Sequence, residues 1–206
     1  MYLTKLLLPL NSWKTAEVLR DCQKMHCLIS SLFDSSRQEK NLLYRSRIEK
    51  NWLALYLYSD IQLKNLPEGI HISGERNLML WLEDMKKGKS YGFDLLTSPS
   101  RKVFQPGQDK EKNSQRRILR RVQERMDWLN RKAGQNGFQI LQVQEMSAPR
   151  IYGRHKDSKG GSMYWNVYHY QGILCIMDEE KFRQVMQKGI GPGKAYGLGM
   201  LLVKNL

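Results

Sequence analysis

The spacing of apolar and polar residues changes several times along the chain, and each change marks the boundary of an expected element. Tyr2–Leu8 is a short apolar run typical of a strand, and Asn11 and Ser12 after it favour the start of a helix. From Trp13 to Phe33 the apolar residues recur at helical spacing in a stripe about 100° wide, which predicts one helix packed on a core. The stripe contains Val18, Cys22, Met25, Ile29, Leu32 and Phe33.

The rest of the first half has the pattern of a small sheet with one more helix. Leu42–Ile48 and Trp52–Tyr58 are expected to be strands joined by a turn at 49–51. A short helix over Glu75–Lys86 and a strand over Ser90–Thr97 follow. The order strand, helix, strand, strand, helix, strand is that of the ferredoxin-like βαββαβ unit.

The second half is expected to repeat this order. Pro99–Ser114 is polar and rich in charge and turn residues, as in a linker or loop. The elements expected after it are an arginine-rich helix over Gln115–Ala133, a strand over Phe138–Glu145, a basic turn over Tyr152–Lys159, a hairpin of Met163–Tyr170 with Gly172–Met177, a helix from Asp178 to a cap at Gly189, and a last strand. The prediction is an α+β fold of two tandem ferredoxin-like domains, residues 1–99 and 115–206, with residues 100–114 between them.

A glycine-rich segment near the C-terminal end is the feature that most strongly suggests a ligand. Five glycines lie between Gly189 and Gly199, together with one proline and one lysine. Glycine's backbone entropy and proline's missing donor exclude a helix or a central strand there. Bare backbone N–H groups can approach phosphate oxygens closely. The residues expected to bind phosphate are Gly191, Pro192, Gly193, Lys194, Gly197 and Gly199.

Two well-known phosphate-binding loops do not fit this segment. A P-loop needs Ser or Thr after its lysine, whereas Lys194 is followed by Ala195. A dinucleotide fingerprint needs its third glycine three residues after the second, whereas Gly193 and Gly197 are four apart. The alternative is a flexible turn before the last strand, without a ligand.

Composition indicates that the partner is an anion. The chain of 206 residues has 34 Lys and Arg against 20 Asp and Glu, a formal net charge of +14, which favours nucleic acid, acidic lipid or an acidic protein. No apolar run approaches the roughly 20 residues that span a bilayer, and the N-terminus lacks a signal-peptide pattern. Cys22, Cys27 and Cys175 form no metal-binding spacing and are expected to be free thiols in a reducing cytoplasm.

Half of the net charge lies in one segment. Residues 101–133 contain eleven Lys and Arg and four Asp and Glu, a net charge of +7. Arg116, Arg117, Arg120 and Arg121 are expected on one side of the predicted helix, where they would face an anionic partner. The alternative is an ordinary solvated helix face.

A second basic group surrounds the predicted basic turn. It consists of Arg150, Arg154, His155, Lys156 and Lys159, with tyrosines and a tryptophan close by in the sequence. Aromatic side chains interleaved with cations suit stacking on unpaired bases while the cations hold the backbone. The alternative is a surface loop without a partner.

His26, at the edge of the apolar stripe, is the candidate for chemistry, and a structural histidine is the alternative. The acidic residues form no paired-carboxylate or metal-binding motif, so chemistry on nucleic acid is expected to be metal-independent. RNA carries its own nucleophile, the 2′-hydroxyl. One histidine beside a cationic loop can move the protons for its attack on the adjoining phosphate, which leaves a 2′,3′-cyclic phosphate and a 5′-hydroxyl.

Several of these motifs together resemble the CasE family, the CRISPR precursor-RNA endoribonucleases of type I-E Cascade systems. The resemblance rests on the opening Met1–Lys5, on Met25-His26, on Trp128-Leu129 and on the glycine motif from 189 to 201, in that order. It implies two RAMP-type ferredoxin-like domains, binding of the CRISPR repeat stem-loop, cleavage at the 3′ base of its stem, and retention of the guide RNA with the other Cascade subunits. His26 aligns with the family's catalytic histidine, and no cofactor or metal is implied.

The chain departs from the family pattern near that histidine. Many relatives have tyrosine where this chain has Gln23, and some have lysine where it has Ser31. An amide cannot transfer a proton. An Arg-x-Arg-Ala-Asn-Pro stretch of many relatives is Asp-Leu-Leu-Thr-Ser-Pro at 94–99 here. Three hypotheses follow: a metal-independent endoribonuclease, a non-catalytic subunit that binds an RNA hairpin, and a basic DNA-binding protein.

Overall fold

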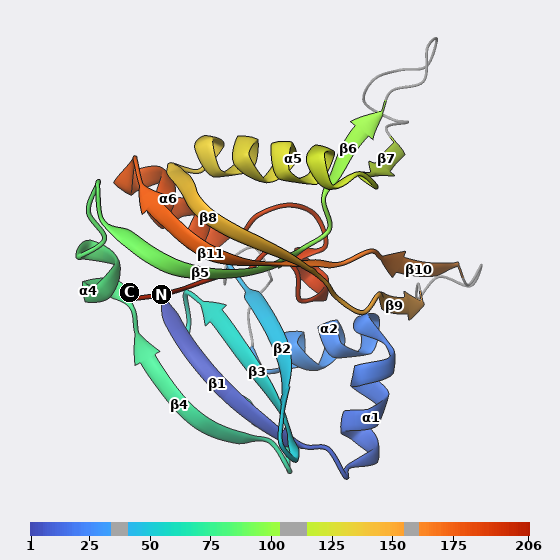
Figure 1. Ribbon diagram of the computed structural model, residues 1–206. Helices are drawn as coiled ribbons and strands as arrows, with labels where there is room; N and C mark the ends of the chain where they lie inside the picture. Colours follow the sequence, from blue (N-terminus) through green and yellow to red (C-terminus); the bar gives the residue numbers. More distant parts are fainter. Residues whose placement is uncertain (34–40, 104–114, 155–160) are drawn as a thin grey trace.

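Two four-stranded antiparallel sheets form the framework of the chain (Figure 1). The computed structural model describes residues 1–33, 41–103, 115–154 and 161–206. The strands follow the order β2-β3-β1-β4 in the first sheet and β12-β5-β11-β8 in the second. In both sheets the first and third strands along the chain lie in the centre, as in the split βαβ arrangement. The predicted tandem of ferredoxin-like folds is therefore confirmed.

The first sheet packs against two short helices. Its strands are β1 (Tyr2–Pro9), β2 (Leu43–Glu49), β3 (Trp52–Ser59) and β4 (His71–Asn77), and its helices are α1 (Trp13–Arg20) and α2 (Cys22–Ser31), with α4 (Met79–Glu83) following β4. Met25 and Ile29 of α2 share a buried cluster with Leu6, Leu53 and Leu55 of the sheet. Burial of this apolar face fixes α2 on the sheet, while the rest of the helix is half-buried or exposed.

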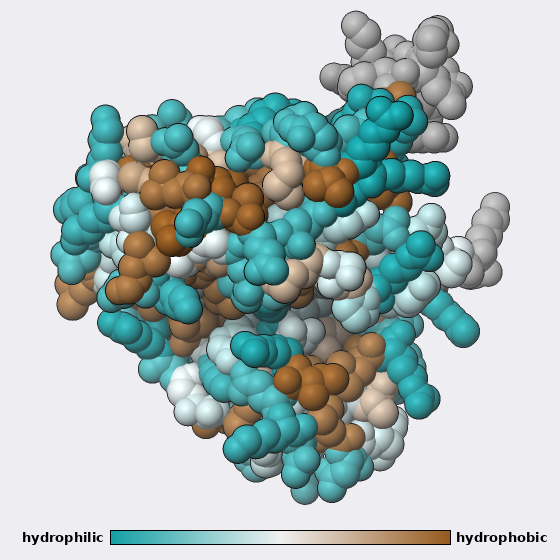
Figure 2. Space-filling model, viewed as in Figure 1, coloured by the Kyte–Doolittle hydropathy of each residue, from teal (hydrophilic) through white to brown (hydrophobic). Residues whose placement is uncertain are grey.

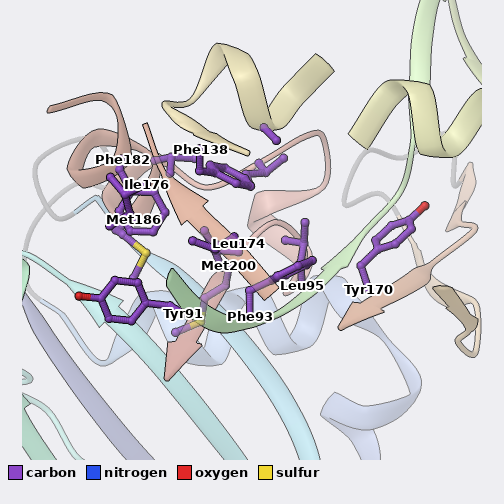
Figure 3. Close-up of a cluster of buried hydrophobic side chains, with 14 of the residues drawn as sticks. Tyr91, Phe93, Leu95, Phe138, Tyr170, Leu174, Ile176, Phe182, Met186 and Met200 are labelled. Carbon is purple, nitrogen blue, oxygen red and sulfur yellow. The ribbon is translucent and has the colours of Figure 1, made fainter. Parts of the chain in front are cut away.

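The second sheet packs over a larger core, part of which Figure 3 shows, and Leu43 and Tyr58 of the first sheet also belong to it. Its strands are β5 (Ser90–Thr97), β8 (Phe138–Ser147), β11 (Tyr168–Ile176) and β12 (Leu201–Lys204), and its helices are α5 (Val122–Gln135) and α6 (Glu179–Lys188). Leu95 and Leu174 of the central strands lie in one cluster with Phe138 and Phe182. The predicted C-terminal helix is confirmed as α6, which the chain leaves through Gly189 with φ 68°.

Two hairpins extend from this sheet on the same side of the molecule (Figure 1). They are β6 (Ser100–Val103) with β7 (Gln115–Ile118), and β9 (Ile151–Arg154) with β10 (Ser162–Trp165). The loop between α6 and β12 contains one short 3₁₀ helix, η1 (Lys194–Tyr196). These hairpins and this loop carry most of the predicted binding residues.

A polar cluster joins the two sheets. Arg45 of β2, only 7% exposed, donates to the carboxylate of Asp94 on β5. His169 Nε2 of β11 lies 2.8 Å from Asp94 Oδ1, and the side-chain amide of Gln171 donates to Asp94 Oδ2 at 2.7 Å. Asp94 therefore connects one strand of the first sheet to two strands of the second.

The single helix predicted over 13–33 is wrong, because the segment forms two helices. At Asp21 the backbone leaves the helical region, with φ −138° and ψ 110°. The Asp21 carboxylate accepts the N–H of Gln23 at 2.8 Å, so this residue ends α1 and caps α2. Val18 and Met25 lie in one buried cluster on either side of the break. The apolar stripe therefore continues through it, and periodicity alone indicates a single helix.

The prediction that Ser90–Thr97 completes the first sheet is also wrong. This strand, β5, pairs with β11 and β12 of the second sheet. The fourth strand of the first sheet is β4, and the helix expected over Glu75–Lys86 shrinks to α4. Every residue of β4 is exposed, so no apolar alternation reveals it. The domain bounds at 99 and 115 stay a prediction, and the pairing favours a boundary between β4 and β5.

Two elements of the second half differ from prediction. The helix expected from Gln115 begins only at Val122, because Gln115–Ile118 pairs with β6 as a strand. The hairpin expected around Gly172 is absent, because β11 runs straight through this residue. A Cβ at Gly172 would lie 1.9 Å from the carbonyl oxygen of Gln142, so glycine there permits close approach of β8.

Candidate functional site

His26 lies on the side of α2 that faces the C-terminal half of the chain. Its neighbour Met25 is buried in the core, whereas His26 is half-buried. The imidazole meets the ring of Tyr196 edge to face, with ring centroids 6.1 Å apart and an interplanar angle of 73°. The histidine is therefore not part of the apolar interior, and the glycine-rich loop reaches it.

Tyr196 connects three distant parts of the chain. Its hydroxyl donates to the side-chain oxygen of Gln23 at 3.3 Å, and its ring centroid lies 5.9 Å from that of Trp165 on β10. A helix of the first half, a hairpin of the second half and the C-terminal loop thus converge beside His26. Tyr196 is not among the predicted site residues. Its position as an aromatic residue inside the glycine motif is the sequence feature that could have identified it.

The glycine-rich loop has a closed path. All five glycines from Gly189 to Gly199 have positive φ values, between 68° and 83°. The N–H of Ile190 donates to the carbonyl of Gly199 at 2.8 Å, and the N–H of Gly199 donates to the carbonyl of Leu96 at 2.7 Å. These bonds tie both ends of the loop together and attach it to β5.

Close packing holds the loop between the two halves. A Cβ at Gly191 would lie 2.7 Å from the hydroxyl oxygen of Thr97 and 3.1 Å from Trp128 of α5. A Cβ at Gly197 would lie 2.9 Å from the ring of Tyr44 on β2. Side chains at these two positions would displace the loop, which argues against the alternative of a flexible turn.

Three of the four predicted arginines line a cavity of about 520 Å³, but they do not form a helix face. Arg116 and Arg117 lie on β7 and, as neighbours in a strand, point to opposite sides, while Arg120 and Arg121 lie between β7 and α5. The cavity is lined by Arg101, Arg117, Ile118, Leu119, Arg120, Arg121 and Glu124. Hydrophilic side chains cover this corner of the molecule (Figure 2).

A second cavity, of about 570 Å³, lies between the first-half helices and the segment around β9. Tyr196 lines it from the loop, and Arg150 and Tyr152 line it from the second half. Arg20 and Arg47 line it from the first half. The cavity therefore combines aromatic and cationic side chains next to the His26–Tyr196 contact.

The other predicted cations are placed as follows. Arg154 is exposed at the end of β9, and Lys156 and Lys159 lie outside the described residues. Lys194 lines a third cavity, of about 530 Å³, together with Arg116 and the first part of the glycine-rich loop. The predicted binding residues that line cavities thus divide among three of them rather than forming one stripe.

Residues 1–33, 41–103, 115–154 and 161–206 offer neither a cluster of metal ligands nor a membrane-spanning helix. In this part of the chain no three His, Cys, Asp or Glu side chains gather to hold a metal ion, and no helix is long and apolar enough to cross a membrane. The predicted free thiols are confirmed for Cys22, Cys27 and Cys175. Burial and the nearby Asp21 raise the pKa of Cys22 to about 11, so this thiol is unreactive.

The fold and the site define a protein class: two ferredoxin-like units in tandem, with cation-lined cavities around a loop that contacts one histidine. The chain belongs to the CRISPR associated protein family, whose model matches residues 1–205. The family resemblance found in the sequence is confirmed by this match.

Similar proteins are known by sequence and by structure. The chain is 27% identical over 128 residues to the CRISPR-associated endoribonuclease Cse3 of Thermus thermophilus; the match covers 58% of this chain and 57% of that relative, little more than half its length. A structure of the CRISPR endoribonuclease Cse3 bound to a 19-nucleotide RNA has a TM-score of 0.84 at 24% identity, with 99% and 100% of the two chains covered. A chain of a CRISPR RNA-guided surveillance complex has a TM-score of 0.74 at 24% identity and full coverage of both chains. These structural likenesses concern the fold.

Proposed function

We propose that this protein is an endoribonuclease that processes CRISPR precursor RNA without a metal ion. It binds the stem-loop of the repeat, cleaves at the 3′ base of the stem, and stays on the mature guide RNA beside the other Cascade subunits in the cytoplasm. The observation that carries this proposal is the contact of half-buried His26 with Tyr196 of the glycine-rich loop. Family membership and the similarity to Cse3 endoribonucleases support an RNA substrate.

In the proposed reaction the 2′-hydroxyl of the RNA attacks its own adjoining phosphate. His26 removes the hydroxyl proton or protonates the departing 5′ oxygen. Backbone N–H groups of the loop stabilise the charge that develops on the phosphate oxygens, and Lys194 holds a neighbouring phosphate. The O2′–P bond forms and the P–O5′ bond breaks, which leaves a 2′,3′-cyclic phosphate and a 5′-hydroxyl.

Tyr196 and Gln23 act as positioning residues in this mechanism. The hydrogen bond from Tyr196 to Gln23 and the ring contact with His26 fix the loop relative to α2. Gln23 stands where many relatives have tyrosine and cannot transfer a proton. The phenol of Tyr196 donates to Gln23 at that position, and its ring contacts His26.

The cations hold the RNA from several sides. Arg117, Arg120 and Arg121 bind phosphates of the stem at the arginine-lined cavity, and Arg150 binds the strand near the cleavage point. The remaining residues proposed to contact RNA are Arg116, Arg154, Lys156, Lys159, Gly191, Pro192, Gly193, Lys194, Gly197 and Gly199.

The test is cleavage of a repeat-containing transcript in EDTA, followed by analysis of the product ends. We expect cleavage by the wild type and a cyclic phosphate on the upstream product. His26→Ala is expected to slow cleavage by about 10²–10⁴-fold with little change in RNA affinity. The exposed His71 supplies a matched control, His71→Ala, with the wild-type rate. A reaction that EDTA abolishes would contradict the metal-free mechanism, and an unchanged rate in His26→Ala would remove His26 from it.

A non-catalytic RNA-hairpin-binding subunit is the second candidate. Gln23 and Ser31 favour it, since neither supplies the proton donor or the cation that relatives have there. The Ser31 hydroxyl donates to the carbonyl of Leu28 at 2.8 Å within its own helix. Tight hairpin binding without any cyclic-phosphate product would establish this candidate. Equal competition by duplex DNA would instead support a DNA-binding protein.

A further inference from the structure

The cavity of about 530 Å³ beside the glycine-rich loop is strongly cationic. Its walls come from three elements: the loop itself, the β6–β7 hairpin and the last turns of α5. Six cations line it, and none of its described lining residues is acidic. The six are Arg101, Lys102, Arg116, Arg131, Lys132 and Lys194. A concave site lined by one sign of charge focuses its potential on an anion that enters.

Three of these cations are crowded without a carboxylate. Among the described residues, the ion pairs do not include Arg116, Arg131 or Lys132. Burial lowers the pKa of Lys132, and the charges of Arg131 and Arg116 lower it further. Like charges held together in this way repel one another until an anion binds between them.

Ser100 adds an unpartnered hydroxyl to the wall of the same cavity. The residue is 8% exposed, and within the described part of the chain its Oγ has no hydrogen-bond partner. Buried polar side chains almost always have a partner, so this group indicates a missing one. A phosphate oxygen can accept from the hydroxyl and from the neighbouring Lys and Arg side chains together.

We propose that this cavity binds a phosphate of the RNA other than the one that is cleaved. The inference rests on the proposed function, since the ligand is the repeat RNA. The glycine-rich loop joins the two places: Tyr196 contacts His26, whereas Gly191 and Lys194 line the cavity. A strand bound along the loop thus has one phosphate at His26 and another in the cavity. The cavity determines which phosphodiester reaches His26.

An RNA backbone suits this cavity better than an acidic protein segment. The β6–β7 hairpin separates it from the arginine-lined cavity, with Lys102 and Arg116 paired across the strands and Arg101 and Arg117 paired at the next position. Cations therefore continue from one side of the hairpin to the other. A polyanion with regularly spaced phosphates can occupy both sides at once.

The first experiment measures binding of the repeat hairpin to Lys132→Gln, Arg131→Gln and Ser100→Ala. We expect each charge variant to bind about tenfold more weakly, and the slope of log affinity against log salt to fall by about one unit. Ser100→Ala is expected to show a smaller loss without a change of slope. The matched control is Arg76→Gln, an exposed arginine on β4, with affinity within about twofold of the wild type.

The second experiment locates the phosphate. A series of hairpins carries one neutral methylphosphonate each, and every RNA is measured against the wild type and Lys132→Gln. We expect one position where neutralisation weakens wild-type binding about tenfold but does not weaken the variant further. Cleavage mapping of Lys132→Gln and Arg131→Gln is expected to show products at neighbouring phosphodiesters.

Different outcomes separate this inference from the proposed function. If each methylphosphonate weakens binding to Lys132→Gln as much as it weakens binding to the wild type, at every position, the cavity inference is overturned. Cleavage by the wild type would be unaffected by that result. Normal RNA binding by the variants with loss of association to other complex subunits would overturn it too, and would assign the cavity to an acidic protein surface. If the wild type binds the repeat hairpin no more tightly than a scrambled RNA of equal length, the proposed function is overturned instead.

Discussion

At the scale of single residues, Tyr196 is the side chain on which the geometry at His26 depends. Tyr196→Phe keeps the ring against His26 and removes the hydrogen bond to Gln23. A neutral hydrogen bond contributes about 1 kcal/mol, so cleavage is expected to fall roughly fivefold with RNA affinity unchanged. Tyr196→Ala also removes the ring, and cleavage is expected to fall about 10²-fold because His26 loses its orientation. Single-turnover cleavage with enzyme in excess measures both rates.

A pH–rate profile of the Tyr196 variants distinguishes positioning from a general loss of structure. If Tyr196 orients His26, the variants are expected to change the shape of the profile as well as its height. Gln23→Ala, which removes the same hydrogen bond from the other side, is expected to match Tyr196→Phe. A Tyr196→Ala enzyme with the wild-type rate and profile would contradict this role.

How well single residues could be predicted depends on whether their signal is local. His26 and Lys194 could be selected because an amphipathic helix and a glycine motif are visible in the sequence. The meeting of Tyr196 with Trp165 and Gln23 could not, since these residues come together only when the two sheets pack. Ser100 gave no signal either, because an unpartnered hydroxyl is a property of the folded state alone.

At the scale of elements, a buried ion pair holds α5 on the second sheet. Arg125, 5% exposed, donates to both carboxylate oxygens of Glu145 on β8, at 2.8 and 2.6 Å. The Tyr170 hydroxyl donates to the same carboxylate at 2.8 Å, and the Arg125 guanidinium lies 4.1 Å from the ring centroid of Tyr168. Arg125 also donates to the carbonyl of Arg120, so this network positions the arginine-lined cavity.

Arg125→Met is expected to lower the free energy of unfolding by about 3–5 kcal/mol, because it leaves the half-buried carboxylate of Glu145 without its partner. The double variant Arg125→Met/Glu145→Gln is expected to recover part of this loss, since the uncompensated charge is gone. Urea unfolding followed by circular dichroism measures both, with the exposed Arg76→Met as control. A loss below about 1 kcal/mol in Arg125→Met would contradict the importance of this pair.

Elements with local end signals could be predicted, and elements made by distant pairing could not. Asp178 and Gly189 mark the ends of α6 in the sequence, and the helix lies between them. β7 has an arginine-rich sequence with no strand pattern and exists because it pairs with β6. The arginines expected on a helix therefore lie on β7 and just after it, and their contact with RNA stays a prediction.

At the scale of the whole molecule, strand β5 shows why tandem repeats are hard to divide by sequence. Its apolar residues fit the fourth strand of one ferredoxin-like unit as well as the first strand of the next. The choice depends on hydrogen bonds to β11 and β12, which follow it by about 70 or more residues in the sequence. The number and order of elements predicted the fold class, while the allocation of strands needed the structure.

The junction of the two sheets is expected to weaken in acid through Asp94. Burial alone would raise the pKa of Asp94, but hydrogen bonds from Arg45 and Gln171 outweigh it and hold this pKa below its ordinary value. Such a group stabilises the fold above its unfolded pKa of about 3.9, and the contribution is lost as pH falls through the lower folded pKa. Asp94→Asn is expected to cost about 3–5 kcal/mol near neutral pH, because Arg45 is left buried without a carboxylate.

The pH dependence of that cost isolates Asp94 from the other carboxylates. Glu145 also has a lowered pKa, because the hydrogen bonds from Arg125 and Tyr170 outweigh its burial. The wild type and Asp94→Asn therefore both lose stability in acid through Glu145. The difference between wild type and Asp94→Asn removes the Glu145 contribution, since it is common to both. Urea unfolding from pH 7 to pH 2.5 is expected to show this difference constant down to about pH 4 and shrinking below it. A difference that stays constant to pH 2.5 would mean that the Asp94 carboxylate does not join the two sheets.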